Sequence, residues 1–273
     1  MELPERGQQL KSRFIRERGF WVEEYEGVVA LCPDFLEAHL ASSTIATKAE
    51  GISPLFGEFI AIAIDVSTTH LFESGLRLHM RNAFNLGATP LQIATVIQLV
   101  SSIGVQSQLV GLPILDEVVA GGVARGSGDA PLSAEQEELK TAFIAHNYVW
   151  SSLHDRLLRA SPAYFAAQLK INAVIVENGA LSPRERALIM VAANGSVTHL
   201  QTDALRLSIK AALLAGASVE DITFVLRRVS SLGMHSCMFG FPILMSEMER
   251  KNEEKHMPSA EAQGIMASRE PRT

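Results

Sequence analysis

The chain has 273 residues, a net charge of −6 at neutral pH and an apolar share of 47%, to which aromatic residues contribute only 6%. The acidic balance argues against a nucleic-acid-binding protein, which needs a basic face, and the scarcity of aromatic residues predicts cores of Ala, Leu, Ile and Val. The apolar run at residues 59–64 stops at Asp65, well short of the ~18 residues that a membrane span needs.

The most informative feature is an internal repeat at an offset of 129 residues. Residues 10–118 align with residues 139–247 without a gap, and about 33 of the 109 aligned positions are identical. The identities include Thr69-His70-Leu71, which matches Thr198-His199-Leu200. A unit of about 110 residues has the size of a domain rather than of a solenoid repeat. We therefore predict two tandem modules of one kind that pack as a pseudo-dimer about a pseudo-twofold axis.

The segments outside the repeat have other compositions. Residues 119–138 include a run of Gly, Ala and Ser that is typical of a flexible linker, although Ser133 to Gln136 forms a capping box that should open a helix. Residues 248–273 are polar, and we predict a disordered tail. The first residues carry no apolar stretch of the signal-peptide type, so the expected location is cytoplasmic.

Each copy is punctuated like a helical protein. Ser53-Pro54 and Ser182-Pro183 place a serine N-cap before a proline, and each pair precedes a stretch that is apolar on all sides, as in a buried helix. Two further helices should follow, each opened by a hydroxyl side chain and closed near a glycine. These opening and closing residues are Thr69, Gly87, Thr89 and Gly104 in the first copy, and Thr198, Gly216, Ser218 and Gly233 in the second. No segment alternates with a period of two, so the predicted fold is all-α.

One of these helices resembles a family signature. The string from Gly75 through His79 to Ala83 is followed by Leu86-Gly87-Ala88-Thr89-Pro90. It is similar to the signature of the carboxymuconolactone decarboxylase and alkylhydroperoxidase D-like superfamily. The resemblance covers roughly residues 53–115 and 182–244. It implies a helical module that assembles through its long helices, usually into trimers or hexamers of single modules.

The departures from the signature bear on the reaction. Peroxidase members of this superfamily carry a CxxC whose second cysteine lies four residues before the helix histidine. Phe72 and Gly75 occupy those positions in the first copy, and Gln201 and Ala204 in the second. A peroxidatic site needs a thiolate with a resolving thiol nearby. Thiol peroxidase activity is therefore disfavoured, and the two cysteines of the chain predict neither a disulfide framework nor a cysteine zinc site.

The remaining candidates suit acid–base chemistry on a carboxylate. His70 and His199 should lie at predicted helix starts, where the positive end of the helix dipole lowers the pKa of an imidazole. Arginine binds carboxylates well. The candidate catalytic residues are His79, His70, His199, Glu73 and His235, and the candidate substrate-binding residues are Arg77, Arg206 and Gln106.

Each candidate also has a structural interpretation. Glu73 and Arg77 are spaced to form a surface ion pair, while His70 and His199 could brace a turn and His235 could lie in an interface. The helix histidine occurs only in the first copy, because Ser208 takes its place in the second, so we predict two unequal sites. Four other histidines match no partner and are expected at the surface: His39, His146, His154 and His256.

Two hypotheses for function follow. The first is a cofactor-independent lyase or isomerase, like the decarboxylase members of the family, that acts on a small carboxylated lactone or ring-cleavage product of aromatic compound catabolism. The second is a non-catalytic oligomeric scaffold or small-ligand-binding protein that kept the fold. No phosphate-binding loop or metal-ligand spacing is present, so no cofactor and no metal are expected. The high apolar share predicts a homo-oligomer, a trimer or dimer of chains, with neither nucleic-acid nor membrane partners.

Overall fold

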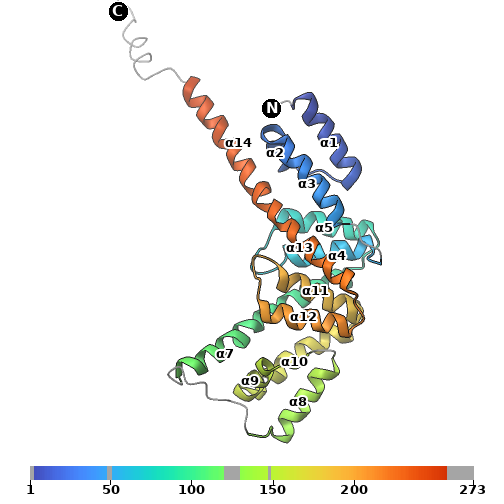
Figure 1. The fold of residues 1–273 in the computed structure, drawn as a ribbon, viewed down its shortest axis with the longest axis vertical. Helices are drawn as coiled ribbons and strands as arrows, with labels where there is room; N and C mark the ends of the chain where they lie inside the picture. The colour runs from blue at the N-terminus through green and yellow to red at the C-terminus, as the bar shows by residue number, and fades with distance from the viewer. Residues whose placement is uncertain (1–2, 48–50, 120–129, 147–148, 257–273) are drawn as a thin grey trace, which may run out of the picture. The chain divides into compact units, whose positions relative to one another are not determined.

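The computed structural model describes residues 3–47, 51–119, 130–146 and 149–256. These ranges contain helices and no strand, which confirms the predicted all-α fold. In chain order the helices are α1 (Glu5–Arg18), α2 (Tyr25–Leu31), α3 (Pro33–Ala46), α4 (Pro54–Asp65), α5 (Glu73–Asn85), α6 (Pro90–Ser101), η1 (Ser102–Val105), α7 (Gln106–Val119), α8 (Ala134–Ala145), α9 (Ser152–Ala160), α10 (Pro162–Glu177), α11 (Pro183–Gly195), α12 (Thr202–Leu214), α13 (Val219–Ser230), η2 (Ser231–Gly233) and α14 (Met234–His256) (Figure 1).

The order of helices repeats along the chain with the offset of the sequence repeat. The helices α4, α5 and α6 begin at Pro54, Glu73 and Pro90, while α11, α12 and α13 begin 129 residues later at Pro183, Thr202 and Val219. The two sequence copies therefore encode the same succession of central helices.

Contacts divide the chain into two compact units that do not coincide with the two copies. One unit combines the chain up to Ile45 with the chain from Gly233 onward, and the other runs from Ala46 to Leu232. In the first unit α2 packs against α14, and in the second α7 packs against α9. In both cases the last helix of one copy contacts an early helix of the other. The boundaries at residues 118 and 139 describe the sequence repeat and stay a prediction for the modules, as does their packing about a pseudo-twofold axis.

The smaller unit has an aromatic core. The ring of Phe14 is buried and meets the rings of Trp21 and Tyr25 edge-on, with centroid distances of 5.5 and 5.1 Å. Gly27 lets α14 pass close to α2, because a Cβ atom at this position would lie 2.9 Å from Cγ of Met245. Aromatic packing and one close helix contact therefore organise this unit.

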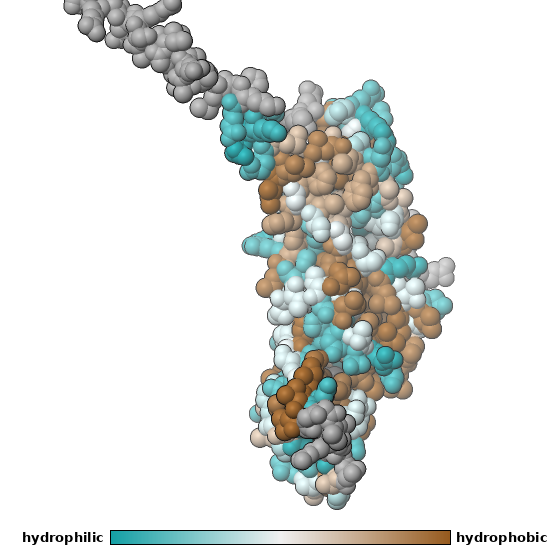
Figure 2. All heavy atoms as spheres, turned by 60° about the vertical axis from the view of Figure 1, so that its left-hand side comes forward, coloured by the Kyte–Doolittle hydropathy of each residue, from teal (hydrophilic) through white to brown (hydrophobic). Residues whose placement is uncertain are grey.

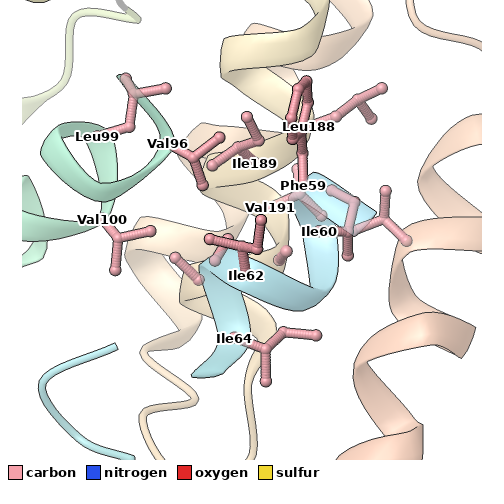
Figure 3. Packing of buried hydrophobic residues seen from close by; sticks show 14 of the residues in the cluster. Phe59, Ile60, Ile62, Ile64, Val96, Leu99, Val100, Leu188, Ile189 and Val191 are labelled. Carbon is pink, nitrogen blue, oxygen red and sulfur yellow. The ribbon is translucent and has the colours of Figure 1, made fainter. Parts of the chain in front are cut away.

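The larger unit is built around α4 and α11, which pack against each other. Figure 3 shows the aliphatic side chains of both helices interleaved, and Ile60, Ile62, Leu188 and Ile189 are completely buried. Helix α6 packs against α11, and α13 packs against α4. The predicted pair of helices that are apolar on all sides is confirmed, since each is covered from several directions.

Local capping explains where these helices begin and end. The Ser182 hydroxyl accepts a hydrogen bond from the backbone N–H of Glu185, whose carboxylate accepts from the Ser182 N–H in return. Gly87 and Gly216 follow the C-terminal ends of α5 and α12. Their φ angles are 90° and 85°, which residues with a Cβ atom rarely adopt. Both features agree with the sequence prediction.

The prediction that Thr69 and Thr198 cap helices is wrong. The helices α5 and α12 begin at Glu73 and Thr202, four residues further on. Each threonine hydroxyl bonds instead to a serine hydroxyl two residues earlier, at 2.9 Å in both copies. The chain then reverses at Leu71 and Leu200, where φ is 49° and 40°. In this turn the backbone N–H groups of Leu71 and Leu200 donate to the carbonyls of Ser67 and Ser196, so they are not available to a threonine N-cap.

Two composition-based expectations also need correction. Residues 248–256 continue α14, so this part of the predicted tail is helical. The predicted capping box at Ser133 does open α8, so residues 134–138, which the predicted linker included, are helical as well. Positions 120–129 and 257–273 lie outside the described residues. By length and composition alone, the continuous helical segment Pro90–Val119 could span a membrane. The shorter apolar run at residues 59–64 could not. The first half of Pro90–Val119, α6, packs into the core like any buried helix, so this is weak evidence for a membrane.

Candidate functional site

The helix histidine of the first copy is paired with an acid from a neighbouring helix. Nδ1 of His79 on α5 lies 2.6 Å from Oε2 of Glu58 on α4. Both side chains are largely enclosed, with 13% and 17% of their surfaces exposed. Burial by itself raises the pKa of Glu58, but the hydrogen bond and charge of His79, followed by the charge of Arg228, hold it below its usual value. The carboxylate is therefore ionised and accepts a hydrogen bond from Nδ1–H of His79, which leaves Nε2 as the reactive nitrogen.

A second carboxyl group faces that nitrogen. Oδ2 of Asp65, the last residue of α4, lies 4.0 Å from Nε2 of His79. Burial raises the pKa of Asp65 to about 8; the charge of Arg228 opposes this rise, and the charge of Glu58 adds to it. Asp65 is thus a neutral acid at pH 7, held beside an ionised glutamate. Two carboxyl groups with pKa values pushed apart are a common arrangement for acid–base chemistry.

Gly75 makes room for this acid. A Cβ atom at Gly75 would collide with Oδ2 of Asp65 and with the ring of Phe72. The space beside the glycine is therefore filled by protein atoms and leaves no room for a ligand. The glycine acts through close packing of α5 against the end of α4.

The equivalent position in the second copy carries a neutral network. Nε2 of His199 lies 2.6 Å from Oε1 of Gln106, and Nε2 of Gln106 donates to Oδ1 of Asn194 at 2.5 Å. Nδ2 of Asn194 donates to the Ser208 hydroxyl at 2.8 Å, and this hydroxyl donates to the backbone carbonyl of Ala204 at 2.9 Å. The bonds run in one direction from an Nε2–H imidazole to a carbonyl. Every member has a hydrogen-bond partner in this chain, and no bond requires a charge.

This neutral network borders a cavity of about 180 Å³. The lining comes from α6, α7, α8, α9, α10, α11 and α12, all within the larger unit. Its walls are mainly aliphatic and aromatic, and Gln106, Asn194 and Ser208 supply polar atoms. A concave apolar site with a few convergent polar groups is typical of small-molecule binding.

The two sites are therefore unlike in chemistry. Asp65 in the first copy is matched by Asn194 in the second, His79 by Ser208, and Glu58 by Ala187. Each substitution removes a titratable group while the helices keep their positions along the chain. One site holds acids and a histidine, and the other holds amides and a hydroxyl. That the two sites are also unequal in activity stays a prediction.

The predicted residues are dispersed around these sites. His70 and His199 are half-buried in the turns before α5 and α12, so they do not lie at helix starts. The pKa of each is lowered, as expected, but the cause is burial rather than a helix dipole. Glu73 and Arg77 are 75% and 70% exposed and bond to each other, as in a surface ion pair.

Other candidates fall outside the His79 cluster. Arg206 is exposed on α12 and does not line the cavity. Gln106 is buried and joins His199, although 93 residues separate them. His235 lies in the first turn of α14 in the other compact unit, and its participation with His79 and His70 stays a prediction. None of His70, Glu73 and His79 lines the cavity described above.

Three residues of the charged cluster were not among the candidates: Glu58, Asp65 and Arg228. A signal for Asp65 existed, since Asp65 and Asn194 stand at matched positions directly after the apolar runs at residues 59–64 and 188–193. A buried polar residue at one position of both copies indicates a paired role rather than a chance surface residue. Glu58 and Arg228 offered no such signal.

Three of the histidines expected at the surface are partly buried. His146 and His154 line the cavity, and burial lowers the pKa of His154 to about 4. The ring of His154 packs 4.7 Å from that of Phe143. His39 is half-buried near Arg18, and burial followed by the Arg18 charge lowers its pKa. His39 and His154 are buried by packing against the rings of Tyr25 and Phe143, which sequence spacing alone does not identify.

Both cysteines are free thiols. Burial, followed by the charge of Cys32, raises the pKa of Cys237 above its usual value. A peroxidatic cysteine needs the opposite, a pKa lowered enough to populate the thiolate. The thiol chemistry of this chain therefore gives no support to a peroxidase.

Comparison with known proteins identifies the family of the chain. No family model and no curated protein matches the chain. Among solved structures, the chain is similar to a protein from Burkholderia xenovorans LB400 described as a "putative gamma-carboxymuconolactone decarboxylase subunit". The two are 30% identical, the match covers 92% of this chain and 100% of that one, and the TM-score is 0.84. With the all-helical fold and the helix histidine, this places the chain in the carboxymuconolactone decarboxylase family.

Proposed function

We propose that the protein is a cofactor-independent lyase or isomerase that acts on a small carboxylated lactone or ring-cleavage product. The observation that carries the proposal is the Glu58–His79 pair beside the neutral acid Asp65. Acid–base catalysis needs a proton carrier whose reactive atom is oriented and whose partners differ in protonation. Family membership supports the substrate class.

In this proposal His79 moves a proton at carbon through Nε2. For a decarboxylation, the bond between the substrate carbon and its carboxylate breaks, carbon dioxide leaves, and the electron pair passes into the unsaturated lactone. His79, in its imidazolium form, then delivers its Nε2 proton to carbon and regains one from solvent. For an isomerisation the same nitrogen removes a proton from one carbon and returns it to another. Glu58 holds the ring in one tautomer during either reaction.

Asp65 and Arg228 complete the proposed site. A neutral carboxylic acid can donate a hydrogen bond to an oxygen on which negative charge develops. Arg228 is buried and lies close enough to lower the pKa values of both Glu58 and Asp65. It is a better candidate for holding a substrate carboxylate than Arg77, whose guanidinium is exposed and lies on the surface with Glu73.

The test is a screen of small unsaturated lactones and acids that carry a carboxylate, run in heavy water. We expect at least one compound to release carbon dioxide or to acquire deuterium at carbon, with product formation proportional to protein concentration. A screen in which no compound loses carbon dioxide or exchanges a carbon-bound proton above the protein-free rate would reject the proposal.

The alternative is a ligand-binding protein without catalysis. One observation favours it: the 180 Å³ cavity lies at the site whose titratable groups have been replaced by Asn194, Ser208 and Ala187. If the whole chain only binds ligands, compounds would bind in a separate titration but show no turnover in the screen.

We also propose that the chain forms a homo-oligomer. The apolar residues Val110, Ile114 and Val118 repeat along one face of α7 and are 39%, 53% and 71% exposed. On α14, Phe239 and Ile243 repeat the first two positions and are 70% and 50% exposed. Figure 2 shows hydrophobic residues open at the surface. Exposed apolar stripes of this kind mark interfaces.

Light scattering should therefore give a mass two or three times the 29.7 kDa of the chain. Ile114→Glu should shift the mass toward the monomer, because a charge on the stripe is costly to bury. A matched Gln108→Glu change on another face of α7 should leave the mass unchanged. A monomeric wild-type protein at micromolar concentration would contradict the proposal.

A further inference from the structure

The cavity of the second copy contains one cationic group and no acid among the described residues that line it. The cationic group is Arg186 on α11, which replaces Gly57 of the first copy. Its Nη1 atom donates to the carbonyl of Leu181 at 2.7 Å. No carboxylate in the described part of the chain lies within ion-pair distance of this guanidinium, so donors remain for an anion.

Amide, hydroxyl and imidazole groups supply the other polar atoms of the lining. Gln106, Asn194 and Ser208 belong with His199 to the directional chain described above, and burial lowers the pKa of His154 to about 4, so this imidazole is uncharged at neutral pH. A ligand carboxylate would therefore meet one opposite charge and no repelling one. The described residues of the lining include no acid that could protonate carbon, in contrast to His79 and Asp65 in the first copy.

The size and walls of the cavity limit the rest of the ligand. An engineered apolar cavity of about 150 Å³ holds one benzene molecule, and this cavity measures about 180 Å³. Phe143 and Phe165 present two rings to it, with Leu99 and Leu169 among the aliphatic walls. One six-membered ring with one short substituent fits these dimensions, and the aromatic walls suit a flat ring.

We infer that this cavity is a non-catalytic binding site for a single-ring monocarboxylate of the size of benzoate, whose carboxylate binds Arg186 and whose ring lies among the phenylalanines. The site is separate from the proposed reaction at His79 and does not depend on it. Duplication thus yields one site for chemistry and one for recognition.

Trp150 provides a direct probe of the site. The chain has two tryptophans, and Trp150 packs 5.7 Å from Phe143 and 5.9 Å from Phe165, both of which line the cavity. In a Trp21→Phe background, the fluorescence of Trp150 alone can be followed during a titration with benzoate. We expect a saturable change, and benzamide, which has the same shape without the charge, should bind at least ~10-fold more weakly.

Three variants in that background complete the experiment. Arg186→Gln should weaken benzoate binding by ~10–100-fold, the usual value of a charge-assisted contact. The control Arg206→Gln removes an exposed arginine outside the cavity and should bind normally. Ala187→Leu should block binding by filling the cavity, which it lines. Thermal melting checks that each variant is folded.

The outcomes separate this inference from the proposed enzyme. His79→Ala should keep benzoate binding even if it loses turnover. The inference is wrong if benzoate gives no saturable signal, if benzamide binds equally well, or if folded Arg186→Gln protein binds like the Arg206→Gln control. None of these results bears on whether His79 is catalytic.

Discussion

Replacing His79 by alanine should lower the turnover of any substrate found in the screen by about 10²–10⁴-fold. Its Nε2 is the atom proposed to carry the proton, and Glu58 fixes the ring at 2.6 Å through Nδ1. Without the imidazole, only water or Asp65 could deliver a proton to carbon. The loss should appear mainly in kcat, because the substrate carboxylate would still meet Arg228.

The second copy supplies the matched control. Ser208 occupies the position of His79 in the same helical frame, buried and bonded to Asn194. Ser208→Ala should change turnover little, although it leaves one donor of Asn194 without its acceptor and could cost ~1 kcal/mol of stability. Both variants are assayed by initial rates on the same substrate, with thermal melting to check folding. Small and equal losses in the two variants would show that His79 is structural.

Helix positions were predictable where local signals decide them. The pairs Ser53-Pro54 and Ser182-Pro183 start α4 and α11 as expected, because a capping serine and a proline in the first turn act on adjacent backbone groups. Gly87 and Gly216 end helices for a similar local reason. The threonine caps failed because the turn at Leu71 and its counterpart is fixed by hydrogen bonds to the preceding serines, a choice that sequence pattern does not reveal.

The candidate site was predictable only in part, because it depends on contacts between helices. His79 followed from the family signature, but its partner Glu58 is 21 residues earlier on another helix. Which residues of α4 face α5 depends on the rotation of two packed helices, and a helix that is apolar on nearly all sides has too few polar residues to reveal it. The bond between Gln106 and His199 likewise crosses from one copy to the other.

The charged cluster makes a second large prediction, on stability against pH. The pKa of Asp65 is about 8 in the folded protein, against an ordinary value of 3.8 for the unfolded chain. Between these values the folded state holds about one more proton at this residue than the unfolded state. The contribution of Asp65 to stability should therefore fall as pH rises from about 4 to 8, by ~1.4 kcal/mol per pH unit at most. Below pH 4 the penalty is absent, and above pH 8 it is constant.

Asp65→Asn should remove this pH dependence, since an amide stays neutral throughout. The second copy already carries Asn194 at the matched position, so an amide suits the end of such a helix. Relative to wild type, the variant should gain stability as pH rises, and the full difference between low and high pH is on the order of 5 kcal/mol. Denaturant unfolding at pH 5, 7 and 9 measures it, as free energies for both proteins under identical salt.

Asp116→Asn is the matched control, because the environment of Asp116 has the opposite effect. The hydrogen bond from Arg156 lowers the pKa of Asp116, so its stabilising contribution is present above pH 4 and is lost only as pH falls through the lowered value. Its removal should shift stability by a constant amount between pH 5 and 9. If Asp65→Asn gave the same flat difference, Asp65 would be ionised in the folded protein at neutral pH. The neutral acid proposed to face His79 would then not exist.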